Sequence, residues 1–157
     1  LRAKEISQLS WREVLNSDGE VDTHINLTNQ SSKGNSGRCI PLHKLVGSNL
    51  AEMYEYQSMF RYFDPQTSFV IRTERSPFTT SQTIVNMFQK WYSTLGLIGC
   101  SSHSGRRTFI TETAKKISLV GGSLRDIQMM AGHSSLQTTQ RYIDADSEAQ
   151  AKVVNLL

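Results

Sequence analysis

Residues 101–142 have the sequence SSHSGRRTFITETAKKISLVGGSLRDIQMMAGHSSLQTTQRY, and this stretch decides the fold. Its apolar residues recur at spacings of three and four, as on the buried face of a helix. Glycines divide it at Gly121-Gly122 and at Gly132, which predicts three successive helices. A serine that can cap each helix precedes it: Ser101 or Ser102, Ser123, and Ser134 or Ser135.

Four polar residues of this stretch can act together on a phosphate. His103 and Arg106 are three residues apart, so we expect them side by side in the first turn of the first helix. His133 follows Gly132, and Tyr142 lies nine residues further on, in the third helix. Helix amides, a guanidinium and imidazoles favour an anion, and a tyrosine can act as a nucleophile. Taken singly, each residue also fits an ordinary role, such as a surface arginine, a turn histidine or a packed tyrosine.

The beginning of the chain predicts the end of a helix. Leu1 to Trp11 carries apolar residues at Ile6 and Leu9, and no capping residue precedes it. Arg2 lies on this helix, with Glu5 one turn away as a salt-bridge partner. We therefore expect the chain to begin inside an element, as a fragment of a longer protein does.

The next part of the chain predicts a small three-stranded antiparallel sheet. A strong turn signal, Asn16-Ser-Asp-Gly19, is followed by alternating polar and apolar residues. A polar loop over residues 31–37 contains Lys33, and Pro41 ends the last strand. The expected strands are residues 14–15, 21–27 and 38–42.

The remaining segments predict further helices. Apolar residues at helical spacing begin after His43. Thr79 and Gln82 have the spacing of a capping box before a helix that ends near Gly96, and residues 147–156 form a last amphipathic segment. Together with the small sheet near the N-terminus, these segments predict an α+β fold that is mainly α-helical.

Composition sets broad limits on the protein. A length of 157 residues with 38% hydrophobic and 20% charged content suits one folded domain. The two cysteines, Cys39 and Cys100, do not make a disulfide framework or a metal cluster. No apolar stretch is long enough to span a bilayer. The net charge of +3 permits a nucleic-acid partner, but the charges are spread along the chain, so the fold would have to assemble a binding surface.

The order and local context of six residues resemble the tyrosine recombinases, also called the phage integrase family. The resemblance covers nearly the whole chain. Gly105 is a departure, because family members more often have a leucine there, and Lys44 is a conceivable substitute for Lys33. The matching motifs are Leu-Arg2-x-x-Glu5-Ile-x-x-Leu-x-Trp11, Lys33 eight residues before Pro41, His103-x-x-Arg106-Arg-Thr-Phe109, Ala131-Gly132-His133-Ser-Ser and Thr138-Thr-x-x-Tyr142.

The resemblance implies roles for these residues. Tyr142 would attack a DNA phosphodiester and form a 3′-phosphotyrosyl bond, releasing a 5′-hydroxyl. Arg2 and Arg106 would hold the non-bridging oxygens, with a hydrogen bond from His133. Lys33 would be the general acid, His103 would assist proton transfer, and Glu5 would orient a neighbouring cation. Neither a nucleotide cofactor nor a metal is needed, because the bond energy stays in the protein–DNA linkage and cationic side chains stabilise the charge.

The resemblance also implies an assembly. Residues 1–157 would be the catalytic domain, preceded in a longer protein by the start of that domain and an N-terminal DNA-binding domain. Its partners would be double-stranded DNA and further copies of itself, in a homo-tetramer that the segment after Tyr142 helps to couple. Accessory DNA-bending proteins are a further expected partner. We expect a bacterial or phage-encoded cytoplasmic protein, with no membrane partner, that integrates or recombines DNA at specific sites.

Three other functions remain to be weighed against this one. A type IB topoisomerase uses the same tyrosine chemistry but rejoins the same strand. A non-catalytic DNA-binding module or excisionase-like accessory factor would not need Tyr142. A metallohydrolase would use His103 and His133 as ligands, but they are thirty residues apart with no carboxylate at ligand spacing.

Overall fold

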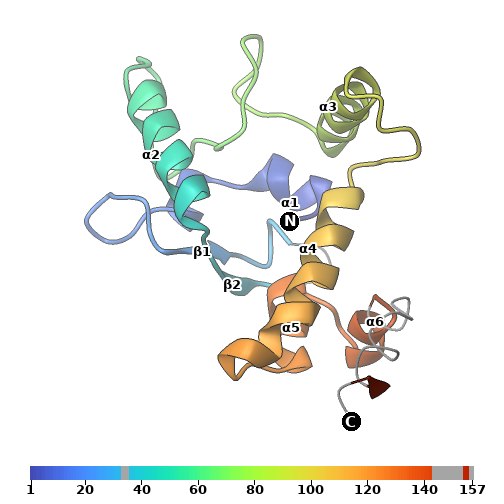
Figure 1. Ribbon diagram of the computed structural model, residues 1–157. Helices are drawn as coiled ribbons and strands as arrows, with labels where there is room; N and C mark the ends of the chain where they lie inside the picture. The colour runs from blue at the N-terminus through green and yellow to red at the C-terminus, as the bar shows by residue number, and fades with distance from the viewer. Residues whose placement is uncertain (33–35, 143–153, 156–157) are drawn as a thin grey trace. The chain divides into compact units, whose positions relative to one another are not determined.

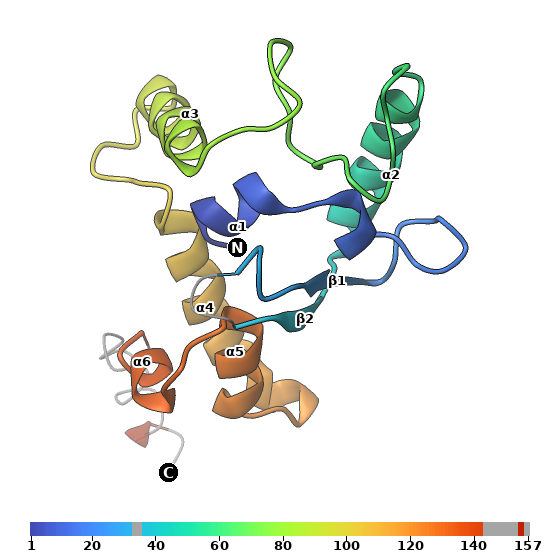
Figure 2. The same cartoon turned by 180° about the vertical axis from the view of Figure 1, so that it is seen from behind.

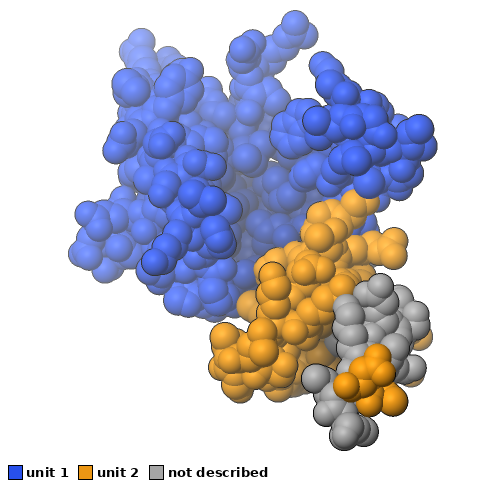
Figure 3. All heavy atoms as spheres, in the orientation of Figure 1, with its two compact units in different colours: residues 1–103 blue, residues 104–157 orange. Residues whose placement is uncertain are grey.

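The computed structural model describes residues 1–32, 36–142 and 154–155. Contacts within the chain divide it into two compact units, residues 1–103 and residues 104–157 (Figure 3). Lys33 lies outside the described residues, as does nearly all of the expected last segment, 147–156. None of the helices in the described part of the chain is both long and apolar enough to cross a membrane.

The described residues are mainly helical, as the sequence predicts (Figure 1). The first unit contains α1 (Ala3–Gln8), a 3₁₀ turn (Trp11–Glu13), β1 (His24–Leu27), β2 (Arg38–Pro41), α2 (Lys44–Ser58) and α3 (Ser81–Thr94). The second unit contains α4 (Ser104–Lys116), a 3₁₀ turn (Ile117–Val120), α5 (Leu124–Ala131) and α6 (Leu136–Gln140).

The sheet of the described residues has two strands, so the prediction of three strands is wrong. β1 and β2 are antiparallel, and Ile25 lies opposite Ile40 (Figure 2). The expected first strand is replaced by a single bridge between Leu15 and Val21. The reason is local, because the amides of Val14 and Leu15 both donate to the Trp11 carbonyl and so extend the turn at residues 11–13. The alternation in β1 is as predicted, since Ile25 and Leu27 are buried and the residue between them is exposed.

The core of the first unit is centred on Trp11, which is 0% exposed. Tyr54 of α2 and Phe63 meet its ring edge to face, at centroid distances of 5.0 and 6.4 Å. The indole N–H donates to Gln57 Oε1 at 3.0 Å, and Gln57 Nε2 donates to the Val70 carbonyl at 2.9 Å. Gln57 therefore provides hydrogen-bond partners for two buried polar groups, the Trp11 indole N–H and the Val70 carbonyl. It thereby links α2 to both residues.

Replacing Gln57 with Leu is expected to lower the free energy of unfolding by roughly 2–3 kcal/mol, because a buried N–H and a buried carbonyl lose their partner. Urea unfolding followed by tryptophan fluorescence measures the change. Glu52→Gln, at an exposed position of the same helix, is the control and should shift stability by less than about 0.5 kcal/mol. An equally small effect of Gln57→Leu would show that the two groups find other partners.

In the second unit, a polar cap and a glycine begin and end α5 where the sequence predicts. Asp126 accepts from the Ser123 amide at 2.7 Å at the start of α5, and Gly132 ends α5 with φ +62°. α5 packs against both α4 and α6. The buried core residues of this unit are Ile110, Ile127 and Ala131.

Three predicted helix boundaries need correction. α4 begins at Ser104, so His103 precedes the helix rather than sharing its first turn. α6 ends at Gln140, so Tyr142 follows this helix by two residues instead of lying in it. The cap of α3 is Thr80, whose hydroxyl accepts from the Thr83 amide at 3.1 Å, and not Thr79.

Candidate functional site

Glu5 joins two arginines in the first unit. Its side chain is 0% exposed, and it accepts from the Arg2 backbone amide at 2.7 Å and from Arg2 Nη1 at 2.9 Å. Arg38 of β2 donates to both carboxylate oxygens, from Nη1 and Nη2, at 3.1 Å each. One carboxylate thus fixes two guanidinium groups by bidentate and backbone contacts, and the three side chains together keep one positive charge.

The contacts of Glu5 change its acidity. Burial by itself raises the pKa of this carboxyl, but hydrogen bonds and the charges of Arg38 and Arg2 outweigh it and lower the pKa to about 2. Glu5 is therefore ionised at neutral pH. The expected role of Glu5 is to orient a neighbouring cation, and the geometry fits this role. The cations that Glu5 contacts are Arg2 and Arg38.

Replacing Glu5 with Gln is expected to lower the free energy of unfolding by roughly 3 kcal/mol at neutral pH, because two half-buried guanidinium groups lose the carboxylate charge that compensates them. The pKa in the folded state lies below the ordinary value of 4.5, so this stabilisation is complete above about pH 4.5 and is lost toward about pH 2. Urea unfolding of wild type and E5Q should therefore converge on acidification. Lys4→Gln, exposed on the same helix, is the control. A wild-type-to-E5Q difference independent of pH would contradict the assignment.

A second buried carboxylate, Glu13, holds the chain that leads toward Lys33. It accepts from the Thr28 amide at 2.8 Å, from the Ser10 amide at 3.0 Å and from the Ser31 hydroxyl. Burial raises the pKa of Glu13, but the hydrogen bonds from Ser31, Ser10 and Thr28 outweigh it and lower the pKa. The end of β1 is thereby tied to the 3₁₀ turn at residues 11–13.

In the second unit, Arg106 is tied to the end of α5. It lies in the first turn of α4, and its Nη2 donates to the Ala131 carbonyl. Ala131 is the last residue of α5 and stands two residues before His133. The contact brings the guanidinium to the carbonyl end of a helix, where a positive charge is favoured.

His133 and Tyr142 form the centre of this part of the site. Their rings are stacked, with 5.6 Å between centroids and 11° between planes. His133 Nδ1 lies 3.0 Å from Thr139 Oγ1, and the Tyr142 amide donates to the Thr139 carbonyl at 3.1 Å. Tyr142 also packs against the core of the unit. It is therefore both a half-buried packing residue and a member of the polar cluster. The cluster therefore combines a phenol, an imidazole and a guanidinium on adjoining elements.

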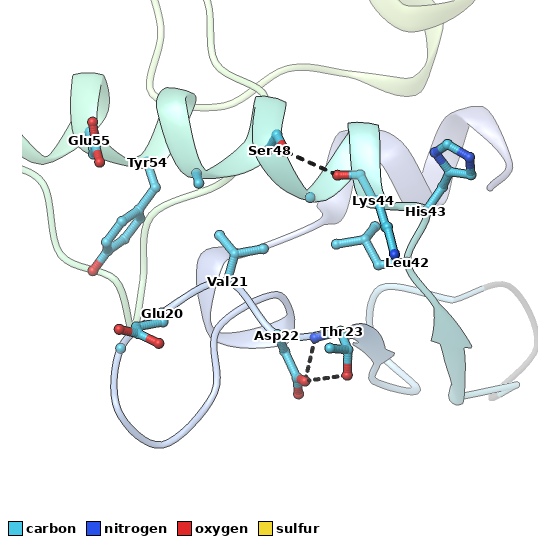
Figure 4. Close-up of a pocket in the computed structure, with 13 residues that line it drawn as sticks. Glu20, Val21, Asp22, Thr23, Leu42, His43, Lys44, Ser48, Tyr54 and Glu55 are labelled. Carbon is cyan, nitrogen blue, oxygen red and sulfur yellow. Dashed lines mark hydrogen bonds between the residues drawn. The ribbon is translucent and has the colours of Figure 1, made fainter.

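His103 and Lys44 belong to the first unit. His103 is exposed, and its amide donates to the Ser101 hydroxyl at 3.3 Å. Lys44, the conceivable substitute for Lys33, begins α2 and lines a pocket of about 630 Å³ (Figure 4). Glu20, Asp22 and Glu55 line the same pocket. Three carboxylates disfavour a phosphate, so this pocket does not suit the predicted chemistry.

The structure adds residues for which sequence patterns predict no role in the site. Arg38 lies in the expected last strand and Thr139 in the motif before Tyr142, while Glu13 and Gln128 belong to none of the matching motifs. Each of these residues forms a hydrogen bond with a predicted site residue or with the segment beside one. The pair Thr138-Thr139 before Tyr142 was the available signal for one of them.

A mainly helical fold with a tyrosine stacked on a histidine, beside an arginine bound to a helix end, defines a candidate phosphate-transfer site. Residues 1–149 match the phage integrase family, and the chain belongs to that family.

Similar proteins agree with this membership. The chain is 34% identical over 154 residues to a tyrosine recombinase XerC of Bradyrhizobium diazoefficiens, which covers 98% of this chain and 44% of the relative. It is 31% identical over 113 residues to a XerD of Haemophilus ducreyi, covering 70% and 36%. This chain thus spans less than half the length of these relatives.

Solved structures show the same fold. XerA recombinase superposes with a TM-score of 0.75 at 20% identity, covering 99% of this chain and 52% of that one. The Tn1549 transposon integrase, in complex with circular intermediate DNA, superposes with a TM-score of 0.68 at 20% identity, covering 100% and 56%.

Proposed function

We propose that this chain is the catalytic part of a site-specific DNA recombinase or integrase in which Tyr142 is the nucleophile. The observation that carries the proposal is the stacking of Tyr142 on His133, whose chain is joined through Ala131 to Arg106. Family membership supports the reaction type. Both compact units, residues 1–157, belong to this catalytic part.

In the proposed reaction, the Tyr142 oxygen bonds to the scissile phosphorus and the 5′-oxygen of the next nucleotide leaves. Arg2 and Arg106 bind the non-bridging oxygens, and His133 donates a hydrogen bond to one of them. These groups stabilise the extra charge of the pentacoordinate transition state. Lys33 protonates the leaving oxygen, and His103 assists removal of the phenolic proton. The 5′-hydroxyl of a second strand then reverses the step.

The electrostatics of the two arginines suit this role. Arg2 shares one carboxylate with Arg38, so the group of three retains a positive charge. Arg106 donates to the Ala131 carbonyl, which carries no charge of its own to offset that of the guanidinium. Both arginines are therefore held in place by contacts on the protein, and a guanidinium is well suited to bind phosphate oxygens. No metal or nucleotide is required in this scheme.

The partners in this proposal are double-stranded DNA and further copies of the protein, arranged as a homo-tetramer on the DNA. Relatives named XerC and XerD, and an integrase solved with DNA, support DNA as the partner. DNA-bending proteins are proposed as accessory partners. The reaction would take place in the bacterial cytoplasm, where the DNA is.

A suicide substrate tests the nucleophile. With a nick close to the scissile phosphate, the full-length protein is expected to form a DNA adduct that resists denaturant, because the short leaving strand diffuses away before it can rejoin. Peptide mapping should place the DNA on Tyr142, and Tyr142→Phe should abolish the adduct while keeping DNA binding. An adduct that persists in Y142F would rule out this nucleophile. Strand exchange rather than relaxation of supercoils would separate a recombinase from a topoisomerase.

Arg106→Lys tests the phosphate contact. Lysine keeps the charge but lacks the two-pronged donor geometry, so adduct formation should slow on the order of 10²–10³-fold in the presence of chelator. DNA affinity, measured by fluorescence anisotropy, should change far less. Lys115→Gln removes a charge at the other end of α4 and is the control, with less than about a twofold effect on the rate. Equal losses of affinity and rate in R106K would assign Arg106 to DNA binding alone.

A further inference from the structure

Three hydrogen bonds to described residues hold His133, and they fix different parts of the residue. Its amide donates to the Gln128 carbonyl at 3.1 Å, and its carbonyl accepts from Gln128 Nε2 at 2.9 Å. These two contacts fix its backbone at the end of α5. The third contact is on the ring, where Nδ1 lies 3.0 Å from Thr139 Oγ1. Rotation of the imidazole therefore depends on Thr139, and on the stacked ring of Tyr142.

Thr139 is suited to hold a ring in one orientation. It is 0% exposed, so water does not compete for its hydroxyl. It lies on α6, three residues before Tyr142, whose amide donates to the Thr139 carbonyl. Thr139 thus contacts His133 through its side chain and Tyr142 through its backbone. The neighbouring Thr138 is only half-buried.

We propose that Thr139 is a positioning residue for His133, and that its hydroxyl donates to Nδ1 and keeps the proton of the neutral ring on Nε2. This inference rests on the proposed function, in which His133 donates a hydrogen bond to the scissile phosphate. A neutral imidazole carries one N–H, and its other nitrogen is an acceptor. If Thr139 accepted from Nδ1 instead, Nε2 would turn a lone pair to an anion, which repels it.

The hydroxyl of Thr139 therefore selects the tautomer as well as the ring angle. Hydrogen bonding at one ring nitrogen commonly determines which form the other takes. Thr139 needs no contact with DNA for this role. It differs from the phosphate-binding residues in acting only through His133.

Two substitutions at one position test the role of the hydroxyl. Thr139→Val keeps the shape of the side chain but removes the donor, and adduct formation on the suicide substrate should slow about tenfold. Thr139→Ser keeps the hydroxyl and should restore most of the rate. Thr138→Val is the matched control on the same helix and should have less than about a twofold effect. Equal rates in wild type and T139V would overturn the proposal.

A double-mutant cycle separates positioning from a purely structural role. In the His133→Ala background, Thr139→Val should change the rate by less than about twofold, because the group through which it acts is gone. A tenfold loss in that background as well would overturn the proposal, since Thr139 would then act independently of His133.

Nitrogen-15 NMR of the histidine-labelled full-length protein tests the tautomer without requiring activity. Neutral His133 should carry its proton on Nε2 in wild type, T139S and T138V, and should show both tautomers in T139V. A proton on Nδ1 in wild type would overturn the proposal. If wild type formed no Tyr142 adduct, the proposed function would fail, while the NMR result would still decide whether Thr139 sets the state of the ring.

Discussion

The buried carboxylate of Glu5 is the interaction on which the first unit depends, because it joins the start of α1 to β2. An isolated carboxylate at 0% exposure would be strongly unfavourable, so both guanidinium groups are needed for its burial. In turn, Arg2 and Arg38 need the carboxylate, since their mutual repulsion is otherwise uncompensated. One carboxylate between two guanidinium groups holds both in place and leaves the group of three with a net positive charge. That excess is what a phosphate would require of this surface.

The second unit holds Arg106 and His133 by a different means. Arg106 donates to the Ala131 carbonyl, and the His133 ring contacts the Thr139 hydroxyl. Both partners are uncharged, so neither cancels a positive charge. The carbonyl end of α5 adds a favourable dipole for the guanidinium. The first unit thus uses a shared anion, whereas the second uses a backbone carbonyl for Arg106 and a hydroxyl for His133.

Sequence patterns predicted the elements wherever a local rule decides the backbone. Ser123 with Asp126, and Gly132 after them, mark the ends of α5 because capping and positive φ are properties of single residues. The third strand was not predictable in this way. Val14 and Leu15 have strand propensity, but the capping box of Ser10 and Glu13 and the packing of Trp11 in the core favour a turn there.

The residues of the candidate site also differ in whether sequence patterns could predict them. Motif order pointed to Arg106, His133 and Tyr142, and the structure gathers these three in one unit. Two of the supporting residues, Arg38 and Ser31, could not be inferred, because their partners are distant in sequence. Arg38 is 33 residues from Glu5, and Ser31 is 18 from Glu13. No periodicity relates such pairs, and their residue types are ordinary for a surface.

The contacts that hold His133, which is proposed to bind the phosphate, also differ from those that hold Tyr142, which is proposed to react. Gln128 holds the His133 backbone at both ends through bonds of 2.9–3.1 Å. Tyr142 has a stacked ring, an amide that donates to the Thr139 carbonyl at 3.1 Å, and a carbonyl that accepts from Thr111 at 3.5 Å, the outer limit of a hydrogen bond. A nucleophile that must become bonded to DNA and later be released has to leave its resting contacts twice in each reaction. Among the described residues, the His133 ring has a hydrogen bond to Thr139 and the Tyr142 ring is held by stacking, and this difference between the two rings fits the chemistry proposed for them.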